Sequence, residues 1–115
     1  MSKKSEIKFY IELDDKKMPE KIEWEATDAE FTGRKESKTM LLSLWDKEEN
    51  ITLGIDLWTK EMMVNDMNVH YHQTFLKMAD TYFRATQNNE AANFIRSFAN
   101  DFAEKLKLLE GKNPE

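Results

Sequence analysis

The chain has 115 residues, of which 34% are charged and 40% hydrophobic, and its formal net charge is -5. This length fits one domain with one modest core, and the mixture of apolar and charged residues argues against disorder. The 17 basic side chains are outnumbered by 22 acidic ones. Nucleic-acid binding is therefore not expected, because contact with phosphate backbones needs a basic surplus.

The sequence contains no cysteine, and it begins MSKKSE instead of with an apolar signal segment. The first observation excludes disulfides and thiolate metal sites. The second argues against a secretory signal. No apolar run approaches the roughly 20 residues that span a bilayer. We therefore expect a single cytoplasmic domain over residues 1–115, without direct membrane insertion.

Two strands are predicted at the N-terminal end. Residues 6–13 alternate between apolar and polar side chains, and residues 21–26 do the same after a charged reversal that contains Pro19. A period of two is typical of a strand with one face toward the core and one toward water. These strands should pair as a hairpin.

The segment 27–38 follows neither the helical nor the strand period. Long connections in compact domains are either functional, mobile or crossovers to another strand. Its charged residues favour a mobile, solvated loop, in which Phe31 is the one candidate anchor.

A second hairpin is predicted from strands at about 39–46 and 51–58. If KEEN at 47–50 is a four-residue loop, Leu44 faces Leu53, Leu42 faces Ile55 and Met40 faces Leu57. All three pairs are apolar, and a slip by one residue would mix the two faces of the hairpin. Residues 53–63 then join the predicted sheet to a helical region.

The reverse face of this hairpin is a candidate protein-contact patch, made by Leu41, Trp45, Gly54 and Trp58. Tryptophans around a floor of small residues are typical of interaction hot spots. Two alternatives remain: another segment of the chain covers the rings, or Gly54 only marks a bulge.

Helical periodicity follows. The first helix is predicted over about 66–85, with Asn65 as the better of two N-cap candidates. The second is predicted over about 90–110, capped by Asn88 or Asn89 and ended by Gly111. The apolar stripes are Met67, Tyr71, Phe75, Met78 and Tyr82 on the first helix, and Ala91, Ile95, Phe98, Phe102, Leu106 and Leu109 on the second.

No residues suggest catalysis or cofactor binding. His70 and His72 are two positions apart, so on a helix they point about 200° apart and cannot share a metal ion. They also lack the carboxylate companions that a metal or general-base site needs. No phosphate loop, nucleophile elbow or dinucleotide motif is present. We expect no catalytic residue, no cofactor and no metal.

Methionines gather where the first helix is predicted to begin. Met62, Met63 and Met67 are flexible and polarizable, so they can form an adaptable groove for variable partners. Gap-filling in the core is the simpler alternative.

Several segments together resemble a known family. KIEWEA at 21–26, MLLSLWD at 40–46, IDLWTKEM at 55–62 and HQTFLKMADTYFRAT at 72–86 are similar to the gliding motility-associated protein GldC family. The resemblance implies a small cytoplasmic accessory of a bacterial gliding or envelope-assembly machinery, with no enzymatic activity. MMVNDM at 62–67 departs from the MPVDEM-like pattern of the family, which puts the start of the first helix in question.

The predicted architecture is α+β: a four-stranded antiparallel sheet followed by two C-terminal helices packed on one face. This element order is similar to that of the export chaperone SecB, although no SecB sequence motif is present. We therefore expect a non-enzymatic adaptor that binds proteins not named by the sequence, with a second copy of the chain as one candidate partner. The alternative is a SecB-like oligomeric chaperone that holds unfolded clients.

Overall fold

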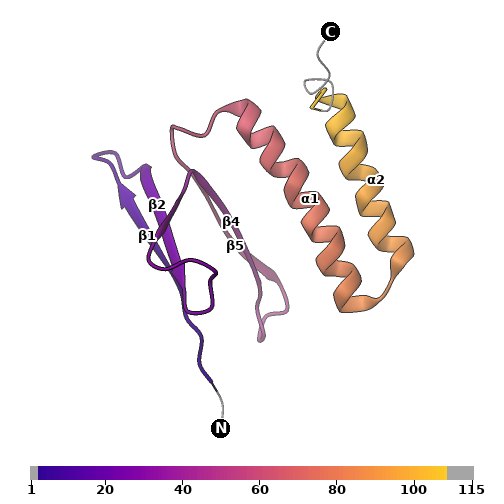
Figure 1. Ribbon diagram of the computed structural model, residues 1–115, viewed down its shortest axis with the longest axis horizontal. Coiled ribbons are helices and arrows are strands. Elements are labelled where there is room, and N and C mark those ends of the chain that lie inside the picture. Colours follow the sequence, from indigo (N-terminus) through magenta and orange to yellow (C-terminus); the bar gives the residue numbers. More distant parts are fainter. Residues whose placement is uncertain (1–2, 109–115) are drawn as a thin grey trace. The chain divides into compact units, whose positions relative to one another are not determined.

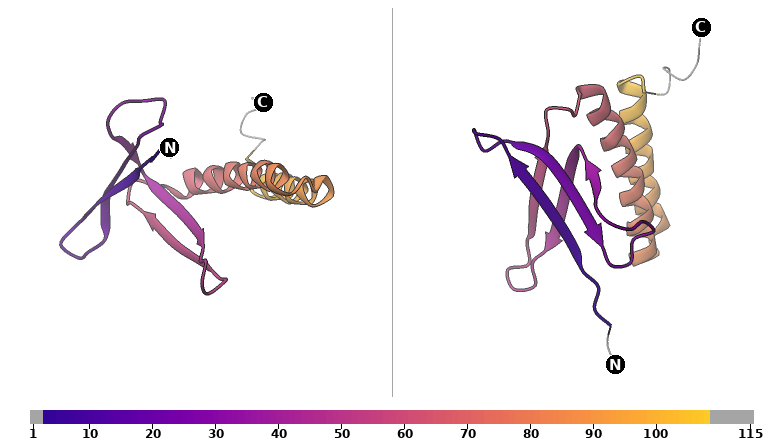
Figure 2. Two further views of the ribbon diagram at one scale, coloured as in Figure 1. Left: turned by 90° about the horizontal axis from the view of Figure 1, so that it is seen from below. Right: turned by 60° about the vertical axis from the view of Figure 1, so that its left-hand side comes forward.

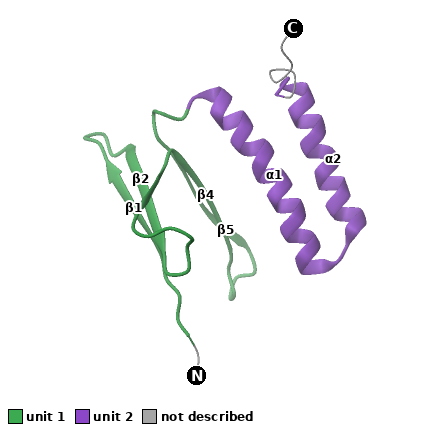
Figure 3. Cartoon of the chain, in the orientation of Figure 1, with its two compact units in different colours: residues 1–62 green, residues 63–115 purple. Residues whose placement is uncertain are grey.

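The computed structural model describes residues 3–108 and contains five strands followed by two helices (Figure 1). The chain divides into two compact units, residues 1–62 with the strands and residues 63–115 with the helices (Figure 3). The α+β class is therefore confirmed, whereas the packing of both helices on one sheet face stays a prediction. The elements are β1 (Ile7–Leu13), β2 (Pro19–Ala26), β3 (Lys35–Ser37), β4 (Thr39–Trp45), β5 (Thr52–Trp58), α1 (Val64–Thr86) and α2 (Asn89–Lys105).

The strands of the first unit form two antiparallel sheets instead of the single four-stranded sheet predicted. One has the order β1-β2-β3, and the other consists of β4 and β5. Lys38 is the only residue between β3 and β4, and the chain bends there. Figure 2 shows the β4–β5 hairpin diverging from β1 and β2 beyond this bend.

Two backbone features mark the division between the sheets. The β2–β3 ladder ends at the pair of Ile22 with Ser37. Beyond this pair, Lys21 and Pro19 of β2 still lie opposite Glu12 and Leu13 of β1.

The second feature is a pair of hydrogen bonds to the carbonyl of Lys38. This oxygen accepts hydrogen bonds from the backbone N–H and from the hydroxyl of Thr59, both at 2.9 Å. The side chain of Thr59 is buried, with 4% of its surface exposed. Lys38 and Thr59 continue the β4–β5 register beyond the Thr39–Trp58 pair, so bonding to β5 begins at the bend.

The predicted register of the second hairpin is confirmed. Leu44 pairs with Leu53, Leu42 with Ile55 and Met40 with Leu57. Asp46 closes the turn, because one of its carboxylate oxygens accepts the N–H groups of Glu48 and Glu49 at 3.1 and 2.7 Å. Asn50 takes the left-handed conformation, with φ 55°, that asparagine tolerates well.

The segment 27–38 makes more hydrogen bonds and ring contacts than a solvated loop would. Its last part forms β3, so the predicted loop is wrong for residues 35–37. At its start, the N–H of Thr27 donates to the carbonyl of Glu6, the residue before β1, at 3.0 Å. Phe31 is an anchor as predicted, since its ring meets the Trp24 ring edge-on at 5.1 Å.

Helix α1 begins at Val64, two residues earlier than predicted, and Asn65 is not its N-cap. Met63 occupies the cap position in an extended conformation and makes no side-chain capping bond. Its carbonyl accepts the first helical bond, from Met67 N–H at 2.9 Å. An apolar residue therefore starts this helix, at the place where the sequence departs from the family pattern.

Helix α2 begins as predicted and ends earlier. The side chain of Asn88 accepts the N–H of Ala91 at 3.0 Å, which confirms the cap. At the other end Lys107 is left-handed, with φ 58°. Its N–H and that of Leu108 bond to the carbonyls of Glu104 and Ala103, which is a Schellman motif. The predicted terminator Gly111 lies outside the described residues.

Small side chains form the seam between the helices. Ala79 of α1 and Ala92, Ala99 and Ala103 of α2 are all fully buried. The aromatic stripe lies beside this seam: the Phe75 ring meets the Phe98 and Phe102 rings at 5.1 and 5.2 Å. The predicted stripe therefore contains real contacts, but the alanines bring the two backbones together.

The alanine seam predicts unequal effects for two substitutions in α2. Ala99→Leu should lower the free energy of unfolding by about 1–3 kcal/mol, because extra methyl groups do not fit a close-packed seam. Phe94→Ala, at a residue that is 80% exposed, should change it by less than about 0.5 kcal/mol. Urea unfolding followed by circular dichroism measures both, and equal losses would contradict the seam.

The turn between β1 and β2 predicts a pH effect at Asp14. The N–H of Met18, the N–H of Lys16 and the charge of Lys60 hold the pKa of this carboxyl below its ordinary value. The stability that this carboxylate contributes is therefore present above its unfolded pKa of about 3.9 and is lost as the pH falls through the folded pKa.

Asp14→Asn should consequently lower the urea midpoint at neutral pH, and its difference from the wild type should shrink in acid. Asp15→Asn is the matched control, because the neighbouring carboxylate makes no bond in this turn, and it should leave the midpoint unchanged. A difference at Asp14 that persists unchanged in strong acid would refute the assignment.

Candidate protein-contact surfaces

The predicted contact patch lies on one face of the β4–β5 hairpin. Trp45 is 67% exposed and Trp58 is 56% exposed. The register pairs Trp45 with Thr52 and Trp58 with Thr39, so the rings lie at opposite ends of the ladder. At ~3.3 Å per residue they are roughly 20 Å apart along the strands. The patch is an elongated strip and not a single cluster.

The middle of this strip carries small side chains. Gly54 lies opposite Ser43, and Leu41 beside them is half-buried. A β-carbon added at Gly54 would lie 3.3 Å from the Leu42 carbonyl oxygen, which is a tight contact with backbone. Gly54 is not at a bulge, because the pairing through it is regular.

The other face of the hairpin is also exposed. Leu44, Leu53 and Ile55, which the alternation assigns to the core, are 57%, 47% and 50% exposed. Both faces of the β4–β5 hairpin therefore present large apolar groups, which is unusual for a sheet whose partner is water.

An apolar hollow lies on the β1-β2-β3 sheet. Its volume is about 300 Å³, and it extends to the first residues of β4. Its lining is almost entirely hydrophobic and includes Ile22, which is 1% exposed. The lining residues are Ile7, Phe9, Ile22, Trp24, Ser37 and Met40.

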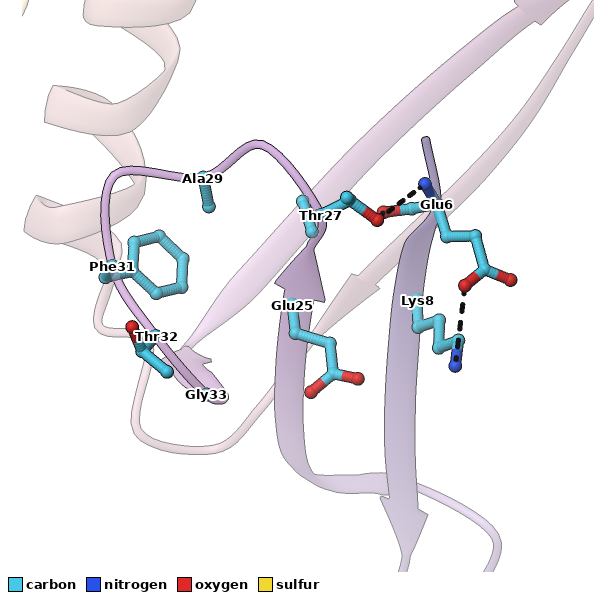
Figure 4. Close-up of a pocket in the computed structure, with 9 residues that line it drawn as sticks. Glu6, Lys8, Glu25, Thr27, Ala29, Phe31, Thr32 and Gly33 are labelled. Atoms are coloured by element: carbon cyan, nitrogen blue, oxygen red, sulfur yellow. Dashed lines mark hydrogen bonds and ion pairs between the residues drawn. The ribbon is translucent and has the colours of Figure 1, made fainter. Parts of the chain in front are cut away.

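A polar hollow of similar volume, about 300 Å³, lies under the loop that follows β2 (Figure 4). Glu6, Lys8 and Glu25 line one side, and Phe31 and Gly33 of the loop line the other. The charges are paired: Lys8 lies 4.0 Å from Glu6, and Glu25 accepts the Tyr10 hydroxyl at 3.0 Å. Paired, solvated charges give this hollow no reactive group.

The three methionines of the predicted groove differ in their exposure. Met63 is 64% exposed, whereas Met62 and Met67 are half-buried. Met63 also starts α1, so it has a structural role in addition to any contact. The groove stays a prediction.

The helical unit contains an exposed aromatic that the sequence reasoning missed. Phe94 is 80% exposed, and Phe98, one turn away on the same side of α2, is 54% exposed. The predicted stripe ran through Ala91, Ile95 and Phe98 and did not include Phe94. The spacing of Ala92, Ala99 and Ala103, at seven and four, is the signal that identifies the true seam.

No candidate centre for metal or acid–base chemistry emerges from residues 3–108. They contain no group of three or more histidine, aspartate or glutamate side chains that could hold a metal ion. The Nε2 atoms of His70 and His72 are buried without a hydrogen-bond partner. Within the same range, no helix is both long and apolar enough to cross a membrane.

Comparison with known proteins fits this picture of surfaces without a reactive centre. The sequence model described as "Gliding motility-associated protein GldC-like" matches residues 19–108, which is most of the chain. The chain belongs to this family. No curated protein and no solved structure is similar enough to match.

The GldC-like match includes the strip, the predicted methionine groove and both helices, and does not include β1. It begins at the first residue of β2 and ends just after α2. The β4–β5 hairpin, with both tryptophans of the strip, lies entirely within it. The family is one of gliding-motility accessory proteins and is not a known enzyme family.

Tryptophan fluorescence tests the exposure of the strip. Variants that keep one tryptophan each, with the other two changed to phenylalanine, separate Trp45 and Trp58 from Trp24. Trp24 is half-buried against Phe31, so its emission should be the least red-shifted and the least quenched by acrylamide. Equal quenching of all three would mean that the strip is covered.

Proposed function

We propose that this GldC-like protein is a non-enzymatic adaptor that binds other proteins of a gliding-motility or envelope-assembly machinery from the cytoplasmic side. The observation that carries the proposal is the exposure of large apolar side chains on both faces of the β4–β5 hairpin. Exposed apolar area of this kind is stabilised when a protein surface replaces water.

The strip formed by Leu41, Trp45, Gly54 and Trp58 is the proposed contact surface. Tryptophans contribute the largest contact area per side chain and dominate many interfaces. The low middle at Gly54 leaves room for a side chain of the partner between the two rings. Met62, Met63 and Met67, around the start of α1, are proposed as an adaptable contact of their own.

A pull-down with this protein as bait tests the adaptor function. The wild type should capture proteins of the gliding machinery from a native lysate, identified by mass spectrometry. Trp45→Ala combined with Trp58→Ala should reduce that capture at least about tenfold, because hot-spot tryptophans contribute 2 kcal/mol or more each. Circular dichroism establishes that the double variant is folded.

Phe94→Ala is the matched control, since it removes an even more exposed aromatic from the helical unit. It should leave capture unchanged if the strip is the contact surface. Undiminished capture by the tryptophan variant would refute the strip, and capture of no motility protein by the wild type would refute the adaptor function.

The second candidate is a chaperone-like activity on unfolded clients. It is favoured by the number of exposed apolar groups in both units, including Phe94, Phe98 and Met78. Such a protein should suppress the aggregation of an unrelated denatured protein, measured by light scattering. Suppression by the wild type and its loss in the tryptophan variant would favour the chaperone over the adaptor.

A further inference from the structure

A small, mostly apolar hollow lies where the end of the turn between β1 and β2 meets the end of β5. Its volume is about 170 Å³, and its lining residues are Met18, Pro19, Asp56, Leu57 and Trp58. Pockets that take whole small-molecule ligands measure roughly 300–1,000 Å³. This hollow is smaller and has room for about one side chain of another molecule.

The apolar part of the hollow is accessible from solvent. Trp58 is 56% exposed and Met18 is 48% exposed, and Pro19 lies between the turn and β2. The aliphatic stems of arginine and lysine pack on surfaces of this kind while their charged ends stay in water. The hollow therefore suits a long side chain with an apolar stem.

Asp56 gives the hollow a negative charge. Its carboxylate is exposed, and the alternation along β5 places it on the same face as Trp58, about 7 Å away at ~3.3 Å per residue. None of the ion pairs formed within residues 3–108 includes Asp56. A wholly apolar occupant would take water from this carboxylate without replacing its hydrogen bonds, which is unfavourable. A cation with an apolar stem satisfies both parts of the hollow.

The neighbouring hollow adds to the negative charge. It shares Pro19 and is lined by three carboxylates and one cation, which are Asp14, Glu20, Glu61 and Lys60. Lys60 already lies 3.8 Å from the Asp14 carboxylate. Two further carboxylates therefore remain near Asp56, and together these charges attract a cationic group.

The chain itself shows how an arginine fits beside an aromatic ring and a carboxylate. The guanidinium carbon of Arg34 lies 3.4 Å from the centre of the Tyr10 ring, and its Nη1 lies 3.4 Å from a carboxylate oxygen of Glu23. A planar guanidinium makes both contacts at once, whereas the compact ammonium of lysine does not stack. Trp58 and Asp56 present the same two groups on one face of β5.

We propose that this hollow binds an arginine side chain of a partner protein. The guanidinium stacks on the Trp58 ring and pairs with the Asp56 carboxylate, and the aliphatic stem lies against Pro19 and Met18. The inference rests on the proposed adaptor function, because it names the chemistry that one end of the strip takes from its partner.

A partner protein fits this site better than a second copy of the chain. The sequence contains three arginines, and each already makes a bond within its own chain: Arg34 with Glu23, Arg84 with Thr81 and Arg96 with Asp80. Binding in the hollow of a second copy would require one of these bonds to break.

NMR titration of the full-length, isotope-labelled chain with N-acetyl-arginine amide tests the site directly. The amide signals of Asp56 and Leu57 and the indole signal of Trp58 should shift, with a dissociation constant of roughly millimolar size, because one side chain makes few contacts. N-acetyl-citrulline amide is the matched ligand, since it has nearly the same shape and no charge. It should bind at least about tenfold more weakly, and equal binding of the two would overturn the proposal.

Asp56→Asn removes the charge and keeps the size of the side chain. It should weaken the binding of N-acetyl-arginine amide about tenfold or more, and circular dichroism establishes that the variant is folded. Asp15→Asn is the matched control, because it removes one charge from the turn without altering the lining of the hollow. Equal weakening by both variants would mean general attraction to an acidic protein and would overturn the site.

The pull-down separates this inference from the adaptor function. Capture that is lost with Trp45→Ala and Trp58→Ala but unchanged by Asp56→Asn would overturn the arginine site and leave the adaptor function intact. Binding of N-acetyl-arginine amide at Asp56 by a chain that captures no motility protein would support the site and refute the adaptor function.

Light scattering distinguishes a partner protein from a second copy. The wild-type chain should show the monomer mass of 13.6 kDa or a larger mass that Asp56→Asn leaves unchanged. A larger mass that falls in the Asp56→Asn variant would assign the arginine to a second copy and overturn the choice of a partner protein.

Discussion

The bend at Lys38 is the constraint on which the strand arrangement depends. One residue separates β3 from β4, and its carbonyl bonds to both polar groups of Thr59. Pairing with β2 ends at Ser37, and bonding to β5 begins at Lys38. This change of partner gives two short sheets instead of one continuous sheet.

The division has a consequence for surface chemistry. In a continuous sheet β4 would have a neighbour on each side, and the hairpin would share its apolar face with the strands beside it. Separated from β2, the β4–β5 hairpin shows apolar residues on both faces, and each of its strands pairs on one side only. A two-stranded hairpin is marginally stable alone in water. Exposed hydrophobic faces and an open edge therefore both favour contact with another protein surface.

The two helices of the helical unit pack against each other through small residues. The alanines of the seam let two helix backbones approach closely, so the large side chains lie beside the seam and above it. Phe75 reaches Phe98 and Phe102 across the pair, and the Arg96–Asp80 ion pair at 3.1 Å joins the helices on the polar side. This arrangement leaves Phe94 exposed, which a stripe of large residues alone does not reveal.

Much of the structure follows from local patterns. The alternation of Leu42, Leu44, Leu53 and Ile55 determined the register of the hairpin, because a slip by one residue would exchange its faces. Asn88 determined the start of α2, since its short side chain caps the helix. The family segments and the absence of reactive motifs pointed to a motility-associated protein without a recognisable catalytic centre.

Other features depend on contacts between residues far apart in the sequence. The division of the sheets depends on where the pairing of β3 with β2 ends, at Ile22 and Ser37, and no periodicity indicates this point. The start of α1 and the end of α2 differ from the predicted positions. Met63 starts α1 without a polar cap, and Lys107 ends α2 in a conformation that usually favours glycine. The sequence by itself determined the elements, their faces and the hairpin register. The tertiary structure decided where the sheet divides and which strand edges stay open, because both depend on which distant group receives each backbone hydrogen bond.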